Sequence, residues 1–306
     1  MLIIGSGGLL GSSLEKMMKK SSFDVSPPMK IDWSNQSSTE LALRSVTNSF
    51  LSNVGSSEWV IAWCAGSYSP NSLHNNTHLE KIHLNVCLDE ISKFESLNRG
   101  LFLFSSSAGA IYQNVIGIAT ELTVPSPVTE YGIMKLESEN LIREWASRKE
   151  INVLIARIST LYGEKQNINK PQGLISHLCH SVLVNKPVMI YASSDSKRDY
   201  LYVDDCSTKL INCISKFKSE NISENKIITK IIASFTTISP SQIIGILNSN
   251  IFRRPKYIFL PSNEYNLSNS DNRFNSVIWK DVDEFEMVSL QIGISKVLAY
   301  TRFSIQ

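Results

Sequence analysis

The stretch Leu2-Ile3-Ile4-Gly5-Ser6-Gly7-Gly8-Leu9-Leu10-Gly11 decides the fold. Its first three residues form a short apolar run that is typical of a buried strand, and from Leu9 to about Lys20 apolar residues recur with helical spacing. Gly5, Gly8 and Gly11 stand three residues apart across the turn and the start of the helix. A glycine turn between a strand and a helix lets a pyrophosphate approach backbone N–H groups at the positive end of the helix. The stretch therefore predicts a dinucleotide site, and a simple tight turn is the alternative.

Composition limits the class of protein. The chain has 306 residues, 42% of them hydrophobic, which suffices for one large α/β domain or a domain plus a smaller lobe. A net charge of +2 gives no indication of binding to nucleic acid or to an acidic membrane surface. The five cysteines lack a Cys-x-x-Cys spacing, which is typical of reduced thiols. The start has no charged leader, and no apolar run approaches the ~18 residues of a membrane helix, so we expect a cytoplasmic protein.

Further apolar runs predict the strands of a parallel sheet. They cover Phe23–Ser26, Glu58–Ala65, Leu101–Phe104, Ile151–Ile158 and Asn225–Ala233, with helical segments between them. This alternation predicts an α/β fold, a Rossmann-type doubly wound parallel sheet of about seven strands with helices on both faces. We expect residues 1–163 to form a dinucleotide-binding domain. Residues 164–306 should form mainly a smaller C-terminal substrate-binding lobe, with segments near 196–250 returning to the first domain.

The second strand lacks an acid at its end, where such an acid usually binds the adenosine ribose. The sequence therefore does not predict that the site excludes a 2′-phosphate on the adenosine ribose, and Lys30 would favour such a phosphate. Asp32 follows, beside Trp33. It either accepts a hydrogen bond from an adenine amino group or caps the helix that starts near Ser38. The small residues Ala65-Gly66 follow the third strand, where a cofactor can pass close to the backbone.

Tyr131 and Lys135 supply the candidate chemistry. Four residues apart on a helix, they share a face and are separated by about 6 Å of rise. A nearby ammonium lowers the pKa of a phenol, which otherwise lies near 10. The pair therefore predicts proton transfer to or from a substrate hydroxyl. Ser105-Ser106-Ser107 end another strand, where parallel sheets bind ligands, and a serine there would orient that hydroxyl toward Tyr131.

Metal binding is not predicted. His74 and His78 stand four residues apart, and His177 and His180 three apart, but no further ligand follows either pair with suitable spacing.

Taken in order, these motifs resemble the extended short-chain dehydrogenases/reductases, in particular the NAD-dependent epimerase/dehydratase group that acts on nucleotide sugars. The matching residues are Gly5-x-x-Gly8-x-x-Gly11, Asp32, Ala65-Gly66, Asn85-Val86, Ser105-Ser106-Ser107 with Ile111-Tyr112, Tyr131-x-x-x-Lys135, Arg157-x-x-x-x-Tyr162-Gly163 and Arg198-Asp199-Tyr200-x-Tyr202-Val203-Asp204-Asp205. They run in the family's order over most of the chain. The last motif, from Arg198 to Asp205, is the most diagnostic of the extended branch.

The resemblance implies roles for these residues. Tyr131 would be the proton donor or acceptor, and Lys135 would lower its pKa and bind the nicotinamide ribose. Ser107 would bind the substrate hydroxyl, or Ser106, because this loop looks one residue longer than usual. Arg198 would contact a nucleotide diphosphate, unless it pairs with Asp199 or Asp204. The cofactor is expected to be NAD, with NADP as an alternative, held by Gly5, Gly8, Leu9, Leu10, Gly11, Asp32, Trp33, Ala65, Gly66, Asn85, Tyr131, Lys135 and Ile158.

Departures from the family refine the expected function. Family dehydratases carry an Asp-Glu pair where this chain has Ala108-Gly109, which disfavours 4,6-dehydration. Thr160 stands where many members have a sugar-binding Asn. The sequence favours a nucleotide-sugar epimerase, with a keto-sugar reductase as the alternative. A reductase of a non-sugar ketone and a non-catalytic NAD(P)-binding regulator also stay open. Family members commonly form homodimers through a bundle that includes the Tyr-Lys helix, and we expect Leu136, Leu141 and Ile142 to be exposed for that contact.

Overall fold

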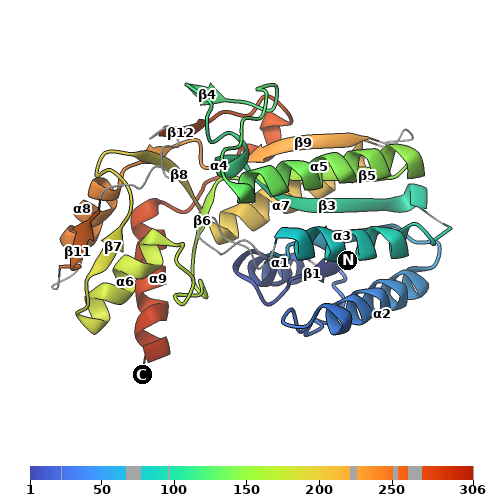
Figure 1. The fold of residues 1–306 in the computed structure, drawn as a ribbon, viewed down its shortest axis with the longest axis horizontal. Coiled ribbons are helices and arrows are strands. Elements are labelled where there is room, and N and C mark those ends of the chain that lie inside the picture. The colour runs from blue at the N-terminus through green and yellow to red at the C-terminus, as the bar shows by residue number, and fades with distance from the viewer. Residues whose placement is uncertain are drawn as a thin grey trace.

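A computed structural model describes residues 1–21, 23–66, 77–95, 97–220, 226–250, 254–260 and 271–305. Its larger part is built on a parallel five-stranded sheet in the order β1-β2-β3-β5-β9, on the right of Figure 1. The strands span Leu2–Ile4, Trp59–Trp63, Gly100–Ser107, Asn152–Ile158 and Ile227–Ile232 respectively. All residues of the second and fourth of these strands are buried, as expected for a parallel sheet covered on both faces.

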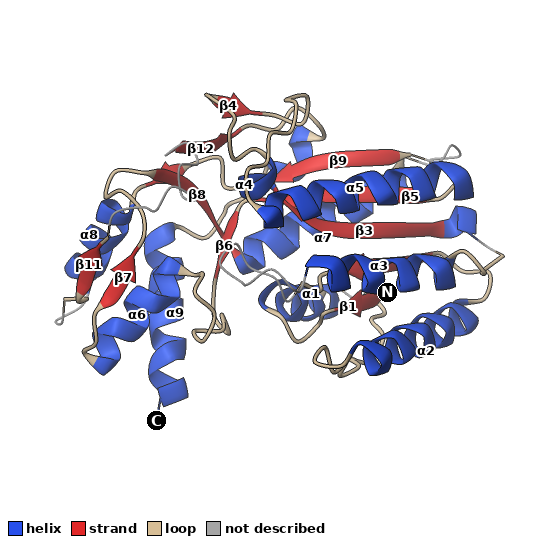
Figure 2. Cartoon of the chain, viewed as in Figure 1, coloured by secondary structure: helices blue, strands red, loops and turns tan. Residues whose placement is uncertain are grey.

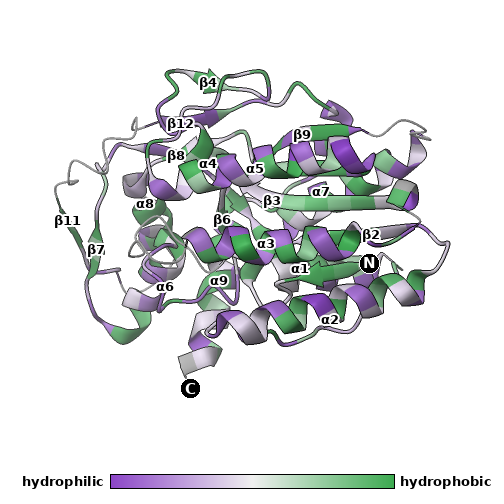
Figure 3. Cartoon of the chain, turned by 45° about the vertical axis from the view of Figure 1, so that its right-hand side comes forward, coloured by the Kyte–Doolittle hydropathy of each residue, from purple (hydrophilic) through white to green (hydrophobic). Residues whose placement is uncertain are grey.

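Hydrophobic cores lie on both faces of the sheet because successive side chains point to opposite sides. In β2, Trp59, Ile61 and Trp63 pack under α2 (Gln36–Val54), α3 (Thr77–Ile91) and α5 (Glu130–Lys149). Val60 and Ala62 pack on the other face, under α1 (Leu9–Lys20) and α7 (Val203–Ser219). The helices mix hydrophobic and hydrophilic residues, whereas the sheet strands are largely hydrophobic (Figure 3). The expected doubly wound α/β fold is confirmed.

The expected strand at Phe23–Ser26 is not formed as a strand, and the sheet has five strands where about seven were expected. The segment still lies beside the start of β1: the Ser26 N–H donates to the Met1 carbonyl at 2.8 Å, and the Met1 ammonium donates to the Asp24 carbonyl at 2.7 Å. Pro27 and Pro28 follow directly and have no N–H to extend the ladder.

A second, mixed sheet belongs to the smaller part of the molecule. Its order is β10-β8-β12-β4, and β6 also pairs with β8; a further two-stranded sheet joins β11 and β7. These strands span Thr237–Ile238 (β10), Lys197–Tyr202 (β8), Asp271–Phe274 (β12), Ile118–Ala119 (β4), Thr160–Tyr162 (β6), Tyr257–Phe259 (β11) and Val188–Ile190 (β7).

Three helices complete this lobe, on the left of Figure 2: α6 (Leu174–Val184), α8 (Pro240–Asn250) and α9 (Leu290–Ile305). They enclose a core that includes Tyr162, Leu178, Tyr202, Ile243 and Ile294. The chain thus crosses between the two parts several times, since α7 and β9 pack on the parallel sheet while α8 packs in the lobe. Short helices at Leu97–Arg99 (η1), Ala108–Ile111 (α4) and Lys280–Asp283 (η3) complete the described elements.

A buried ionic cluster ties η3 to the parallel sheet. The Asp283 carboxylate accepts from the Lys209 ammonium of α7 at 2.7 Å and from the Lys230 ammonium of β9 at 2.6 Å. Both lysine side chains are fully buried. Lys230 also donates to the Ser276 hydroxyl at 2.6 Å, and Ser276 in turn donates to the Glu121 carboxylate. Lysines without solvent contact require such partners, so the C-terminal segment is held by charge as well as by apolar packing.

Candidate functional site

The glycine turn after β1 is tight at two of its glycines. A Cβ on Gly5, which has a φ of +90°, would lie 2.6 Å from the Ala65 nitrogen, and one on Gly11 would lie 2.2 Å from the Gly5 carbonyl oxygen. Only glycine fits either position. Gly8 is the N-cap of α1 and has no side chain to cap it, so the first N–H groups of α1 are left for another acceptor. This geometry fits the predicted pyrophosphate site.

Leu9 and Leu10 begin α1 directly after this turn. The Leu10 side chain is buried in the core between α1 and the sheet, and that of Leu9 is half-buried. Ile158 is buried in the same core at the end of β5. The side chains of Leu10 and Ile158 are thus occupied by core packing, and their contact with a cofactor remains a prediction.

A cavity of about 100 Å³ lies beyond the carboxyl end of β2. Its lining residues are Trp33, Trp63, Ala65, Gly66, Leu79, Glu80 and His83. The predicted cofactor residues Trp33, Ala65 and Gly66 are thus brought together, and the Trp33 and His83 rings meet edge to face at 5.8 Å.

Several polar atoms of the cavity's lining residues lack partners. The Nε1 of Trp63, the Oε2 of Glu80 and the Nε2 of His83 are buried and form no hydrogen bond with any residue that the structure describes. Buried polar groups in native proteins are almost always hydrogen-bonded. Three such atoms around one cavity, next to the uncapped N-terminus of α1, fit a polar cofactor with both donors and acceptors.

Tyr131 and Lys135 both lie in the first turns of α5. Thr129 caps this helix by accepting from the Gly132 N–H at 3.2 Å. The Lys135 side chain is 4% exposed, and its Nζ lies 5.7 Å from the centre of the Tyr131 ring. It donates to Glu80 Oε1 at 2.7 Å. The structure thus brings the predicted pair to the wall of the cavity through Glu80, a residue that the sequence did not indicate.

The pKa of Tyr131 is raised above its ordinary value. Burial raises it most, Lys135 lowers it as expected, and the Glu80 carboxylate raises it again. For Lys135, burial lowers the pKa, but Glu80 and Tyr131 outweigh it, and the net pKa is raised. The lysine alone therefore does not determine the protonation of the phenol, because its charge is shared with Glu80.

The neighbouring serines lie in different surroundings. The Ser106 hydroxyl donates to Glu139 Oε1 at 2.6 Å, inside a buried network in which Glu139 also pairs with Arg157 at 2.6 Å. Ser107 accepts from the Ala110 N–H at the start of α4, and its hydrogen bond with Tyr131 lowers the pKa of the phenol. The structure thus brings Ser107 to Tyr131 and places Ser106 in the network beneath.

Asp32 does not cap α2. Asn35 is the cap, accepting from the Ser38 N–H at 3.0 Å. Asp32 is exposed and accepts from the hydroxyl and the N–H of Ser34, which lower its pKa. That interpretation of Asp32 as a cap is therefore wrong, and contact with adenine remains a prediction.

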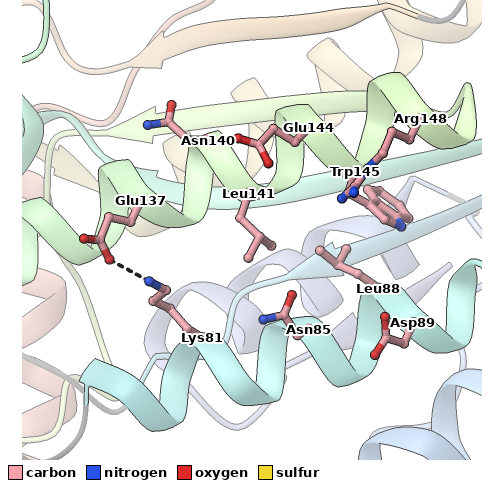
Figure 4. Close-up of a pocket in the computed structure, with 10 residues that line it drawn as sticks. All are labelled: Lys81, Asn85, Leu88, Asp89, Glu137, Asn140, Leu141, Glu144, Trp145 and Arg148. Atoms are coloured by element: carbon pink, nitrogen blue, oxygen red, sulfur yellow. Dashed lines mark hydrogen bonds and ion pairs between the residues drawn. The ribbon is translucent and has the colours of Figure 1, made fainter.

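Asn85 lies away from the cavity. It is exposed and lines an outer groove of about 320 Å³ between α3 and α5, facing Leu141 and Glu137 (Figure 4). Five positions along a helix turn a side chain by about 140°, so Asn85 and the cavity-facing Glu80 lie on different sides of α3. The structure does not bring Asn85 to the other cofactor candidates. Glu80 and His83, three residues apart on the inner side, are the signal that sequence reasoning missed.

The substrate candidates Thr160 and Arg198 lie where the two parts of the chain join. Thr160 begins β6 and pairs with Tyr200 of β8. Arg198 is exposed, and it forms no ion pair with Asp199 or Asp204 among the described residues. Asp204 instead binds Lys16 at 2.6 Å, and Asp199 accepts from the Ser234 N–H. Neighbouring residues of a strand point to opposite faces, which separates Arg198 from Asp199.

In the described part of the chain, no group of three or more His, Cys, Asp or Glu side chains could hold a metal ion. His74 lies outside it, and the His177 Nε2 lies 2.9 Å from the Lys170 carbonyl. No described helix has the length and apolarity that crossing a membrane requires.

Comparisons with known proteins identify the family of the chain. The dTDP-4-dehydro-6-deoxyglucose reductase of Escherichia coli is 32% identical over 130 residues, which are 42% of this chain and 40% of the reductase. A putative UDP-glucose 4-epimerase of Methanocaldococcus jannaschii is 23% identical over 98% of both chains. The structure of UDP-glucose 4-epimerase from Thermotoga maritima with UDP-glucose superposes with a TM-score of 0.81 at 20% identity, covering 100% of this chain and 99% of that one. Residues 1–228 match the NAD dependent epimerase/dehydratase family, and the chain belongs to that family.

Proposed function

We propose that the protein is an NAD-dependent epimerase of a nucleotide sugar. The observation that carries this proposal is the grouping of the half-buried Tyr131 and Ser107 with the buried Lys135 beside a cavity with unpartnered polar atoms. The glycine turn, Trp33, Ala65, Gly66 and Lys135 would hold the cofactor. When bound, it supplies a hydride acceptor and donor.

The residues of this chain would then orient the substrate and transfer its hydroxyl proton. Ser107 would hold the reacting sugar hydroxyl toward the Tyr131 oxygen. Tyr131 would take the hydroxyl proton as the sugar carbon loses its hydride, and would return it when hydride comes back to the other face of the keto-sugar. To take this proton Tyr131 must be ionised: Lys135 and Ser107 favour the phenolate by lowering the phenol pKa, whereas burial and Glu80 oppose it. Ser106 is not proposed for this role, because Glu139 occupies its hydroxyl.

Full-length likeness supports the epimerase over the reductase. The putative 4-epimerase aligns with nearly the whole chain, whereas the likeness to the reductase is confined to 42% of it. A UDP-sugar is accordingly the proposed substrate, with Arg198 and Thr160 as proposed contacts. The keto-sugar reductase remains the second candidate, favoured by its higher local identity and by the missing acid after residues 23–26. A reductase would also accept NADP.

Mass spectrometry of the denatured supernatant from purified protein tests this function first. Retained NAD, with conversion of UDP-glucose to its 4-epimer, supports the epimerase. An empty site that binds NADPH better than NADH, with reduction of a keto-sugar, supports the reductase. Binding of neither cofactor would contradict hydride transfer, whereas cofactor binding without turnover of any nucleotide sugar would favour the regulator.

We also propose a homodimer formed through the outer groove of α3 and α5, which Leu88, Leu141 and Trp145 line (Figure 4). The expected exposure of Ile142 is wrong, since it is fully buried in the core, and Leu136 and Leu141 are half-buried. Light scattering coupled to size-exclusion chromatography checks the dimer, which Leu141→Glu should disrupt.

A cytoplasmic location is proposed from the cysteines. All five are free, and four of them are buried. Burial raises the pKa of Cys64 and Cys87 to about 12, so these thiols remain protonated.

A further inference from the structure

Among the described residues, Glu80 is the carboxylate that another element places against the proposed catalytic lysine. It lies in the first turn of α3, and its side chain is 7% exposed. Oε1 accepts from Lys135 Nζ at 2.7 Å, and Oε2 is buried with no partner among the described residues.

Gly66 lies between this pair and the cavity, and it has no side chain to separate them. A Cβ at Gly66 would lie 3.6 Å from Glu80 Oε1, 3.8 Å from Oε2 and 3.9 Å from Lys135 Nζ. A side chain at position 66 would therefore contact both charged groups and cover them from the cavity.

We propose that Glu80 is a positioning residue that holds the Lys135 ammonium against the cofactor and accepts, through Oε2, a hydrogen bond from a ribose hydroxyl. The ribose part of this inference rests on the proposed function.

The chemistry of the pair selects a sugar hydroxyl over a phosphate. An ionised carboxylate only accepts hydrogen bonds, and an ammonium has three donors, of which Glu80 takes one. A vicinal diol both donates and accepts, so it satisfies Oε2 and the remaining Lys135 donors together. A pyrophosphate would meet the Glu80 charge at close range and is better placed at the N-terminus of α1.

Glu80 also couples to the phenol. Lys135 and Ser107 lower the pKa of Tyr131, and Glu80 and burial raise it. Lys135 is in turn faced by Glu80, Tyr131 and Glu139, and lies near the Cys64 thiol. Because Glu80 neutralises Lys135, its charge helps to set the pH at which Tyr131 loses its proton. Removing that charge leaves the ammonium free to stabilise the phenolate.

Glu80→Gln tests both parts of the proposal. It keeps the size of the side chain and an acceptor for Lys135, but removes the charge. The matched control is Glu137→Gln, because Glu137 pairs with Lys81 at 2.7 Å and joins the same two helices on the outer surface (Figure 4). Calorimetry measures NAD affinity in protein freed of any retained cofactor, and NMR of ¹³Cζ-labelled tyrosine, assigned with Tyr131→Phe, follows the phenol in the same cofactor-free protein.

In Glu80→Gln, we expect NAD to bind about tenfold more weakly, as is typical for loss of a charge-assisted hydrogen bond. We also expect Tyr131 to titrate at a lower pH than in the wild type. Glu137→Gln should change neither. Glu80→Asp restores the charge with a shorter reach, so Tyr131 should titrate near its wild-type pH while NAD binding stays weak.

NAD affinity within twofold of the wild type in Glu80→Gln would overturn the ribose contact, and an unchanged Tyr131 titration would overturn the charge coupling. A lower melting temperature with neither change would mean that Glu80 only stabilises the fold. If the wild type itself bound no NAD, the proposed function would fail, and the tyrosine titration would still decide the coupling.

Discussion

Replacing Asp283 with Asn should destabilise the protein strongly. Asp283 is the counter-charge of Lys209 and Lys230, whose side chains are both 0% exposed. Removing one partner of a buried ion pair costs about 3–5 kcal/mol, because the remaining charge stays out of water. Two ammoniums lose their carboxylate here. Lys230 keeps the Ser276 hydroxyl, and Lys209 keeps the face of the Phe235 ring at 4.6 Å, so these contacts offset part of the loss.

We therefore expect Asp283→Asn to lower the free energy of unfolding by about 4 kcal/mol. Whole proteins are stable by only about 5–15 kcal/mol, so the change is large. Each kcal/mol of lost stability lowers the melting temperature of a protein of this size by about 2–4 °C, so we expect a fall of roughly 10 °C. Circular dichroism during thermal and urea unfolding measures both quantities.

Asp281 supplies the matched control within the same short helix. It pairs with Lys216 at 2.5 Å, but its side chain is 57% exposed, so Asp281→Asn should leave stability nearly unchanged. Lys230→Met in the Asp283→Asn background should recover part of the loss by removing one unpaired charge. Equal melting temperatures for the two Asp→Asn variants would refute the reasoning that burial makes Asp283 important.

Three further predictions concern the site and its support. Tyr131→Phe should retain the cofactor and fold while turnover falls about 10²–10⁴-fold, as steady-state kinetics would show; undiminished turnover would assign the proton to another group. Gly11→Ala should disrupt the turn and weaken NAD binding in calorimetry, because its Cβ would lie 2.2 Å from a carbonyl oxygen, whereas Gly7→Ala, with nothing within 4 Å, should not. Asp205 has its pKa raised from 3.8 to about 6, mainly by burial, so the folded state binds more protons than the unfolded state between those values. Stability should fall as pH rises through that window, and Asp205→Asn should reduce this fall in melting curves recorded at pH 4 and pH 7.

Local patterns in the sequence were enough to predict the fold class, the glycine turn and the proximity of Tyr131 and Lys135. The strand, glycine turn and helix of residues 2–20 form as predicted, because hydrophobic periodicity and the absence of a Cβ act over a few neighbouring residues. The four-residue spacing of Tyr131 and Lys135 places them together for the same reason.

The segment Phe23–Ser26 shows where local pattern is insufficient. Its residues suit a strand, yet its hydrogen bonds to the neighbouring chain are those of Asp24 and Ser26 with Met1, which precedes β1. Whether an extended segment completes a ladder depends on the partner strand and on the prolines that follow it, which is a matter of tertiary pairing.

The tertiary structure alone decided which polar side chains meet. Glu80 and Lys135 are 55 residues apart, and only the packing of α3 against α5 brings their charges to 2.7 Å. Similarly, Glu139 engages Ser106 across 33 residues and leaves Ser107 for Tyr131. Sequence determines which residues a helix or strand carries and on which side. The partner of a buried charge is set by the contacts between distant elements, because burial makes an unpaired charge too unfavourable to remain.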